Sequence, residues 1–100
     1  MILESAMLYI KAGLESDFEQ DFAKASTIIS SMPGYLGHEL YKCMESDHQY
    51  LLHVRWNTLE DHTIGFRGSA EYLDWKQLLH HYYEPFPVVE HFQRVNLSPA

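Results

Sequence analysis

The chain has 100 residues, and this length predicts one domain spanning residues 1–100, because a second core would need a longer chain. Its hydrophobic content of 46%, with 14% aromatic residues, predicts a packed fold and excludes a disordered chain. The formal charge of −7 excludes nucleic acid and an anionic membrane as expected partners, since both are bound through clustered Lys and Arg.

The cysteine content and the hydropathy of the sequence predict the cellular compartment of the protein. Cys43 is the single cysteine, so no disulfide can form within the chain. No apolar run approaches the roughly 18 residues of a membrane span, and the N-terminus lacks the pattern of a signal peptide. We therefore expect a cytoplasmic protein.

The first half of the chain predicts a strand, a helix and a hairpin. Residues 3–11 have strand composition, and Ser16 or Asp17 is expected to cap the helix that follows. The apolar positions of this helix recur every three or four residues: Phe18, Phe22, Ala25, Ile28 or Ile29, and Met32. Pro33-Gly34 ends it. Two strands, 35–45 and 49–57, then pair around a loop at residues 46–48.

The second hairpin strand has two different faces. One is apolar and predicted to face the core: Tyr50, Leu52, Val54 and Trp56. The other is mixed and predicted to contact a second subunit, together with two residues of the neighbouring strand: Leu51, His53, Arg55, Tyr41 and Cys43.

The second half of the chain predicts a broken helical region and a last strand. Thr58 and Ser69 are expected to cap two helices separated at Gly65 and Gly68. Their apolar stripe includes Tyr72, Trp75, Leu79, and Tyr82 or Tyr83. Pro85 and Pro87 end the helices, and residues 88–95 form the last strand.

This order predicts an α+β fold of the ferredoxin-like, split βαβ kind, with a four-stranded antiparallel sheet. A flavodoxin-like parallel sheet would need more strands and a helix between the second and third, where the sequence has a short hairpin.

Four segments in order resemble the antibiotic-biosynthesis monooxygenase family. They read Met-Pro-Gly-Tyr-Leu-Gly at 32–37, Val-Arg-Trp at 54–56, Asn-Thr-Leu-Glu-Asp-His at 57–62 and Gly-Phe-Arg at 65–67. The resemblance implies a homodimer that forms an α+β barrel, with a pocket in each subunit between the sheet and the helices. Some members oxygenate aromatic or quinol substrates with dioxygen and without metal or flavin, others degrade haem, and many have no known activity.

Cofactors are not expected. The haem-degrading branch uses an Asn, a Trp and a His, and the corresponding positions fall near Ala6, Ile64 and Asp74, which do not match. The seven histidines include no HxxxH pair with a Glu base and no cysteine cluster, so no metal site is predicted. The glycines form neither a P-loop nor a dinucleotide-binding motif.

His62 and His91 are the candidate catalytic residues. An unperturbed imidazole titrates near ~6.5, so a neutral His62 could take the proton of a phenol, with His91 orienting it or binding the substrate oxygen. The alternative for His62 is a structural hydrogen bond to a backbone carbonyl at the helix entry.

The candidate substrate-binding residues are His38, Trp56, Phe66, Arg67, Trp75 and Tyr83. Each has an alternative. The aromatic residues could fill the core, Arg67 could bridge Glu71 at i+4, and His38, placed opposite Trp56 by the hairpin register, could be a hydrogen-bonded core histidine.

The function predicted from these residues and the resemblance is a cofactor-independent monooxygenase acting on a small aromatic, phenolic or quinol molecule. One alternative is a dimeric module that binds or senses a small molecule without turnover. Another is an accessory protein whose dimer is its main structural product. Fold alone does not decide among them.

Overall fold

The computed structural model describes residues 1–98. In chain order its elements are β1 (Ile2–Tyr9), α1 (Glu15–Ile29), β2 (Tyr35–Lys42), β3 (Gln49–Trp56), the π-helical turn η1 (Asp61–Phe66), α2 (Ala70–Leu79), the 3₁₀ turn η2 (His80–Tyr82) and β4 (Val89–Phe92). The four strands form one antiparallel sheet in the order β2-β3-β1-β4. This is the ferredoxin-like α+β fold that the sequence predicts.

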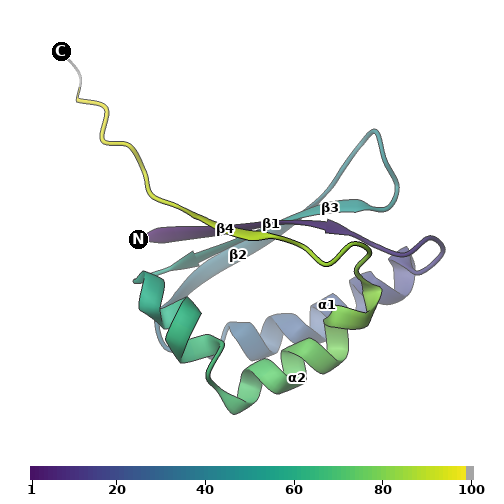
Figure 1. Ribbon diagram of the computed structural model, residues 1–100, viewed down its shortest axis with the longest axis horizontal. Helices are drawn as coiled ribbons and strands as arrows, with labels where there is room; N and C mark the ends of the chain where they lie inside the picture. Colours follow the sequence, from purple (N-terminus) through teal and green to yellow (C-terminus); the bar gives the residue numbers. More distant parts are fainter. Residues whose placement is uncertain (99–100) are drawn as a thin grey trace.

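Both long helices cover the same face of the sheet, and the opposite face carries no helix of residues 1–98 (Figure 1). The core lies between the helices and the covered face. All four apolar β3 residues predicted to face it are buried: Tyr50, Leu52, Val54 and Trp56. Because side chains alternate along a strand, this result also fixes which residues of β1, β2 and β4 face the helices.

Helix α1 packs through the predicted stripe as far as Ile29, since Phe18, Phe22, Ala25 and Ile29 are all buried. The helix ends there and not at Pro33-Gly34, so Met32 lies outside it. Its predicted start at Ser16 or Asp17 is wrong. The helix begins at Glu15, and no side chain caps it. Leu14 at the N-cap position packs against the core, and its carbonyl accepts the first helical hydrogen bond from Phe18 N at 2.9 Å. Tertiary packing therefore sets the start of the helix.

The loop that joins β2 and β3 is longer than the sequence predicts. Cys43 N donates to Gln49 O at 2.8 Å and closes the hairpin, so β2 ends at Lys42 rather than at residue 45. The pairing register shifts by two residues as a result. His38 lies opposite Val54, not opposite Trp56 as predicted, but a shift of two keeps it on the covered face.

Strand β4 is also shorter than the predicted residues 88–95. It pairs with β1 alone, with Phe92 opposite Leu3, and β1 begins one residue before that at Ile2. Beyond Phe92 the chain has no strand of residues 1–98 beside it. The end of β4 is therefore set by the start of its partner.

Both predicted caps in the second half are present. Thr58 Oγ1 accepts from Asp61 N at 3.1 Å while Asp61 Oδ2 accepts from Thr58 N at 3.1 Å, a reciprocal pair that starts the turn η1. Ser69 Oγ accepts from Tyr72 N at 3.2 Å and starts α2. None of the helices within residues 1–98 is long and apolar enough to cross a membrane.

Alanine at Gly34 tests how the capped turn is held. Gly34 has φ +83°, and an added Cβ would overlap the Asp61 carboxylate. Gly13 has φ +85° with open space around it, so it isolates the backbone effect. Gly13→Ala should lower the free energy of unfolding by about 1 kcal/mol and Gly34→Ala by roughly 2 to 3 kcal/mol, because Asp61 must also give up its cap.

Urea unfolding of both variants measures the difference. In an Asp61→Gly background, which removes every Asp61 atom that an added Cβ would overlap, the extra loss at Gly34 should disappear. Equal losses for Gly13→Ala and Gly34→Ala in the natural background would show that Asp61 does not constrain Gly34.

Candidate functional site

A cavity of about 400 Å³ lies between the covered face of the sheet and the helical second half of the chain. Its floor is apolar and formed by strand residues, namely Ala6, Leu8, Leu52 and Val89. Four aromatic side chains form its walls: Tyr72, Trp75, Tyr83 and Phe86. Its polar side chains are Glu4, His62, Arg67 and His80. An apolar cavity with a few convergent polar groups is typical of a small-molecule site.

Glu4 is the buried polar group of this cavity. It extends from the covered face of β1, is 6% exposed, and its Oε1 accepts from Trp56 Nε1 at 2.9 Å. His62 Nε2 lies 3.3 Å from the same oxygen. The pairing of Ile2 with Trp56 brings the indole next to Glu4, and η1 brings the imidazole. Three elements therefore meet at one carboxyl oxygen.

His62 is held on three sides. It is 3% exposed, its ring stacks on Trp56 with an interplanar angle of 20°, and Phe66 lies beside it. Its Nδ1 lies 2.7 Å from His91 Nε2, so one ring donates to the other. His91 reaches this position because β4 places it opposite Glu4. The predicted structural alternative, a bond from His62 to a backbone carbonyl, is replaced by this contact between imidazoles.

Burial shifts the pKa values of His62 and Glu4 in opposite directions. The pKa of His62 is lowered to about 3 by burial, followed by the nearby charges of Arg67 and His91. Burial also raises the pKa of Glu4, while the Trp56 hydrogen bond and Arg67 oppose that rise. This lowered pKa makes His62 a neutral imidazole and a weak base at physiological pH, and its role as acceptor of a phenolic proton stays a prediction.

The opposite end of the cavity is aromatic. Phe66 packs edge-on against Tyr72 and Trp75, and His80 packs edge-on against Phe86 with ring centroids 4.9 Å apart. Burial, followed by the charge of Glu4, raises the pKa of Tyr83. Its hydroxyl consequently keeps its proton and remains a hydrogen-bond donor.

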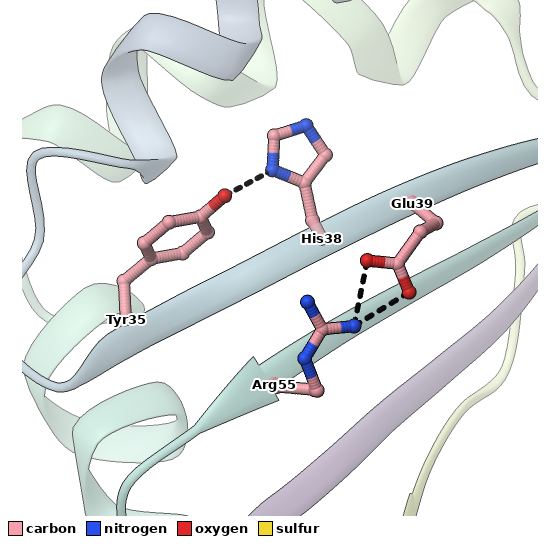
Figure 2. A network of polar contacts seen from close by, with 4 residues as sticks. All are labelled: Tyr35, His38, Glu39 and Arg55. Atoms are coloured by element: carbon pink, nitrogen blue, oxygen red, sulfur yellow. Dashed lines mark hydrogen bonds and ion pairs between the residues drawn. The ribbon is translucent and has the colours of Figure 1, made fainter.

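His38 lies outside this cavity, in a separate network. Figure 2 shows the Tyr35 hydroxyl reaching the His38 ring, and Arg55 facing both carboxylate oxygens of Glu39. His38 Nε2 lies 3.1 Å from Ser26 Oγ, which itself donates to the Phe22 carbonyl at 2.9 Å. Ser26 therefore accepts from His38, and the imidazole links β2 to α1. These hydrogen bonds match the predicted alternative of a hydrogen-bonded histidine, and a substrate-binding role for His38 stays a prediction.

The sequence profile of the antibiotic biosynthesis monooxygenase family matches residues 1–78. The chain belongs to this family. The matched part contains Glu4, His62, Arg67 and Trp75, whereas His80, Tyr83, Phe86, Pro87 and Val89 of the cavity follow it.

Two proteins that are more than 30% identical to this chain match it over nearly the whole length of both sequences. "Uncharacterized protein YczJ" of Bacillus subtilis is 63% identical over 95 residues, which cover 95% of this chain and all of YczJ. A protein of Bordetella bronchiseptica, provisionally described as an antibiotic biosynthesis monooxygenase, is 33% identical with a TM-score of 0.89 over 95% of this chain and 97% of its own.

SnoaB, a cofactor-independent oxygenase from Streptomyces nogalater, has a TM-score of 0.79 at 18% identity. The match covers 99% of this chain and 97% of SnoaB. At this identity the likeness shows the shared fold.

The predicted site residues divide into three groups, of which His38, in its separate network with Tyr35 and Ser26, is one. His62, Arg67, Trp75 and Tyr83 line the cavity. Trp56, Phe66 and His91 lie behind its wall, where they contact His62. Arg67 is exposed at the cavity rim, and no ion pair with Glu71 within 4.0 Å is found among residues 1–98, so the predicted surface bridge is wrong.

Sequence reasoning missed Glu4, His80 and Phe86 as cavity residues. A signal for Glu4 was present, because Ala6 and Leu8 follow it at spacings of two and share its face of β1. A carboxylate on an otherwise apolar strand face needs a partner or a function. Within residues 1–98, no three metal-binding side chains lie close enough together to hold an ion.

Acid titration tests the neutral state of His62. The unfolded chain binds a proton at this imidazole near pH 6.5, whereas the folded chain does so near pH 3, so stability falls as pH drops between these values. His62→Gln should remove up to about 1.4 kcal/mol per pH unit from the slope of unfolding free energy between pH 6 and 4.

Urea unfolding at each pH gives these slopes, and His81→Gln is the matched control at an exposed histidine. The control should retain the wild-type slope. A His62→Gln slope equal to that of the wild type would mean that His62 is protonated in the fold.

Proposed function

We propose that this protein is a cofactor-independent monooxygenase that acts on a small aromatic, phenolic or quinol compound in the cavity. The cavity itself is the observation that supports this most: it combines aromatic walls, one buried carboxyl group and a cationic rim at Arg67. The walls suit a planar ring, and the polar end suits a hydroxyl group that becomes an anion. Family membership and the fold shared with a cofactor-independent oxygenase agree with this chemistry.

The reaction begins when the substrate hydroxyl loses its proton. The electron-rich ring of the resulting anion gives one electron to dioxygen, and the two radicals combine into a peroxide with a new C–O bond. The peroxide takes up a proton, its O–O bond breaks, and the same ring carbon loses its hydrogen as a proton. One oxygen atom then remains as a carbonyl and the other leaves as water. The protein contributes deprotonation, stabilisation of the anion and exclusion of bulk water.

Arg67 is the proposed anion-binding group. It is exposed at the rim, where it can meet a substrate as it enters, and its guanidinium always carries a positive charge. A binding or sensing protein could use the same cavity without turnover, and a test of oxygen consumption separates the two functions. The single Cys43, which cannot form a disulfide within the chain, agrees with action in a reducing cytoplasm.

We further propose that the protein is a homodimer whose subunits meet through the open face of the sheet. Apolar side chains on that face remain exposed at Met7, Tyr41 and Phe92. Leu51 and Arg55 are half-buried there, and Arg55 is paired with Glu39. A chain of this size gains stability by covering such a face with a second copy.

Oxygen consumption with a panel of reduced quinols and phenols tests the proposed activity. We expect uptake with at least one compound, and labelled dioxygen should leave one labelled atom in the product. Arg67→Met should lower kcat/KM by roughly 10- to 100-fold, the effect of losing a charged hydrogen bond. Arg94→Met, at an exposed arginine outside the cavity, should leave it unchanged. Ligand-dependent melting shifts without oxygen uptake would instead indicate a binding protein.

Sedimentation tests the proposed dimer. The wild-type chain should sediment as a dimer at micromolar concentration, and Arg55→Glu should weaken association, because it replaces the Glu39 ion pair with two adjacent carboxylates. Lys24→Glu is the matched charge reversal on α1, away from the open face, and should leave the dimer intact. A wild-type monomer, or equal dissociation of both variants, would contradict this interface.

A further inference from the structure

Glu4 is the acidic residue of the cavity. Among the cavity-lining residues of the described chain no other carboxylate occurs. It stands on β1 between the buried core of the sheet and the polar end of the cavity, with Val54 of β3 and His91 of β4 opposite it on the two neighbouring strands. Its backbone is therefore fixed on both sides by sheet hydrogen bonding, which gives the carboxyl group a rigid base.

The two oxygens of Glu4 have different surroundings. Oε1 accepts from Trp56 Nε1 at 2.9 Å and lies 3.3 Å from His62 Nε2. Oε2 makes no hydrogen bond within residues 1–98. Every fully buried side-chain oxygen in this part of the chain has a partner, so Oε2 is not fully buried. Since Glu4 lines the cavity, Oε2 is open to it. One oxygen is held by the protein and the other faces the ligand space.

The neighbouring groups favour Glu4 over His62 as a proton acceptor. Burial raises the proton affinity of the carboxylate and lowers that of the imidazole. His62 and His91 face Glu4 from η1 and β4, and Arg67 acts on it from the rim. Tyr83 carries a proton, and Tyr72 and His80 line the far wall. Burial lowers the pKa values of His62, His80 and His91 but raises that of Glu4, so the carboxylate with its free oxygen is the favoured acceptor of a hydroxyl proton.

We propose that Glu4 Oε2 accepts the hydroxyl proton of the aromatic substrate, and that Trp56 and His62 are positioning residues that hold Oε1. The substrate O–H bond breaks, an O–H bond forms at Oε2, and the electron pair stays on the substrate oxygen near Arg67. No electron is transferred in this step. The proton can return to the peroxide in the later step. This inference rests on the proposed monooxygenase function and names the base and the substrate class, a hydroxyarene.

Anaerobic binding of 4-nitrophenol tests the proton transfer without turnover. Its phenol and phenolate forms absorb at different wavelengths, so saturating binding at a pH below its solution pKa reports its ionisation. The wild type should bind it as phenolate. Glu4→Gln keeps a carbonyl oxygen for Trp56 and should bind it as neutral phenol, whereas Glu71→Gln, an exposed control on α2, should behave as the wild type. A phenolate band that persists in Glu4→Gln, or is missing in the wild type, would overturn the proposal.

An infrared difference spectrum of the wild type gives a second readout that does not depend on how the variant folds. Binding of the nitrophenol should create the C=O stretch of a protonated carboxylic acid, which shifts when glutamate is labelled with ¹³C. Absence of this band would contradict proton transfer to Glu4.

Turnover separates this inference from the proposed function. With an active quinol, Glu4→Gln should lower kcat by about 100-fold or more and restore activity as rising pH ionises the substrate in solution. Wild-type turnover with an unchanged Glu4→Gln rate would reject Glu4 as the base and leave the monooxygenase function standing. A phenolate band in the wild type without any oxygen uptake would reject the monooxygenase function and leave the proton transfer standing.

Discussion

The hydrogen bond from the Trp56 indole to the Glu4 carboxyl group is the interaction on which the site depends. It joins the end of β3 to the start of β1 beneath the helical layer. A carboxyl group on this apolar face would be costly to bury without a donor, since an unpaired buried polar group costs roughly 1 to 3 kcal/mol or more. Trp56 supplies the donor, and the indole in turn forms the surface on which His62 stacks. Loss of Trp56 would therefore affect the carboxyl group and the imidazole together.

The hydrogen-bond donors around Glu4 are directed at one of its two carboxyl oxygens. If His91 Nε2 donates to His62 Nδ1, then His62 carries its proton on Nε2, which lies towards Glu4 Oε1. The indole proton points to the same oxygen. Donors then converge on one side of the carboxyl group, and the other side faces the cavity with Arg67 at the rim. An apolar core would be simpler and at least as stable, so this arrangement is more easily explained by function than by folding.

The order of elements could be predicted because it is encoded locally. Pro33-Gly34 lies in the turn between α1 and β2, Gly68 lies between η1 and α2, and apolar spacing distinguishes strand from helix. Strand ends could not be predicted, because they depend on distant partners. Strand β4 stops where β1 begins, and β2 stops where Cys43 pairs with Gln49. Because β2 ends earlier than expected, His38 pairs with Val54 and not with Trp56.

The candidate site was predictable in position but not in chemical state. The segment around His62 could be located from its place after Trp56, yet its burial and its contact with His91 come from the folded structure. Burial and the nearby Arg67 and His91 lower the pKa of His62 to about 3, so its imidazole is a weaker base than the sequence alone suggests. Glu4 was overlooked because a single charged residue in a strand usually faces solvent. Its assignment required the pairing of β1 with both β3 and β4.

The protonation state of the His62 ring decides most directly whether the cavity is built around Glu4. Nitrogen-15 NMR of histidine-labelled protein, with His62 assigned by comparison with His62→Gln, reports which ring nitrogen carries the proton as pH is lowered from 8 to 5. The account predicts a neutral ring protonated at Nε2 across this range. A ring that becomes doubly protonated near pH 6.5, or a neutral ring protonated at Nδ1, would contradict it.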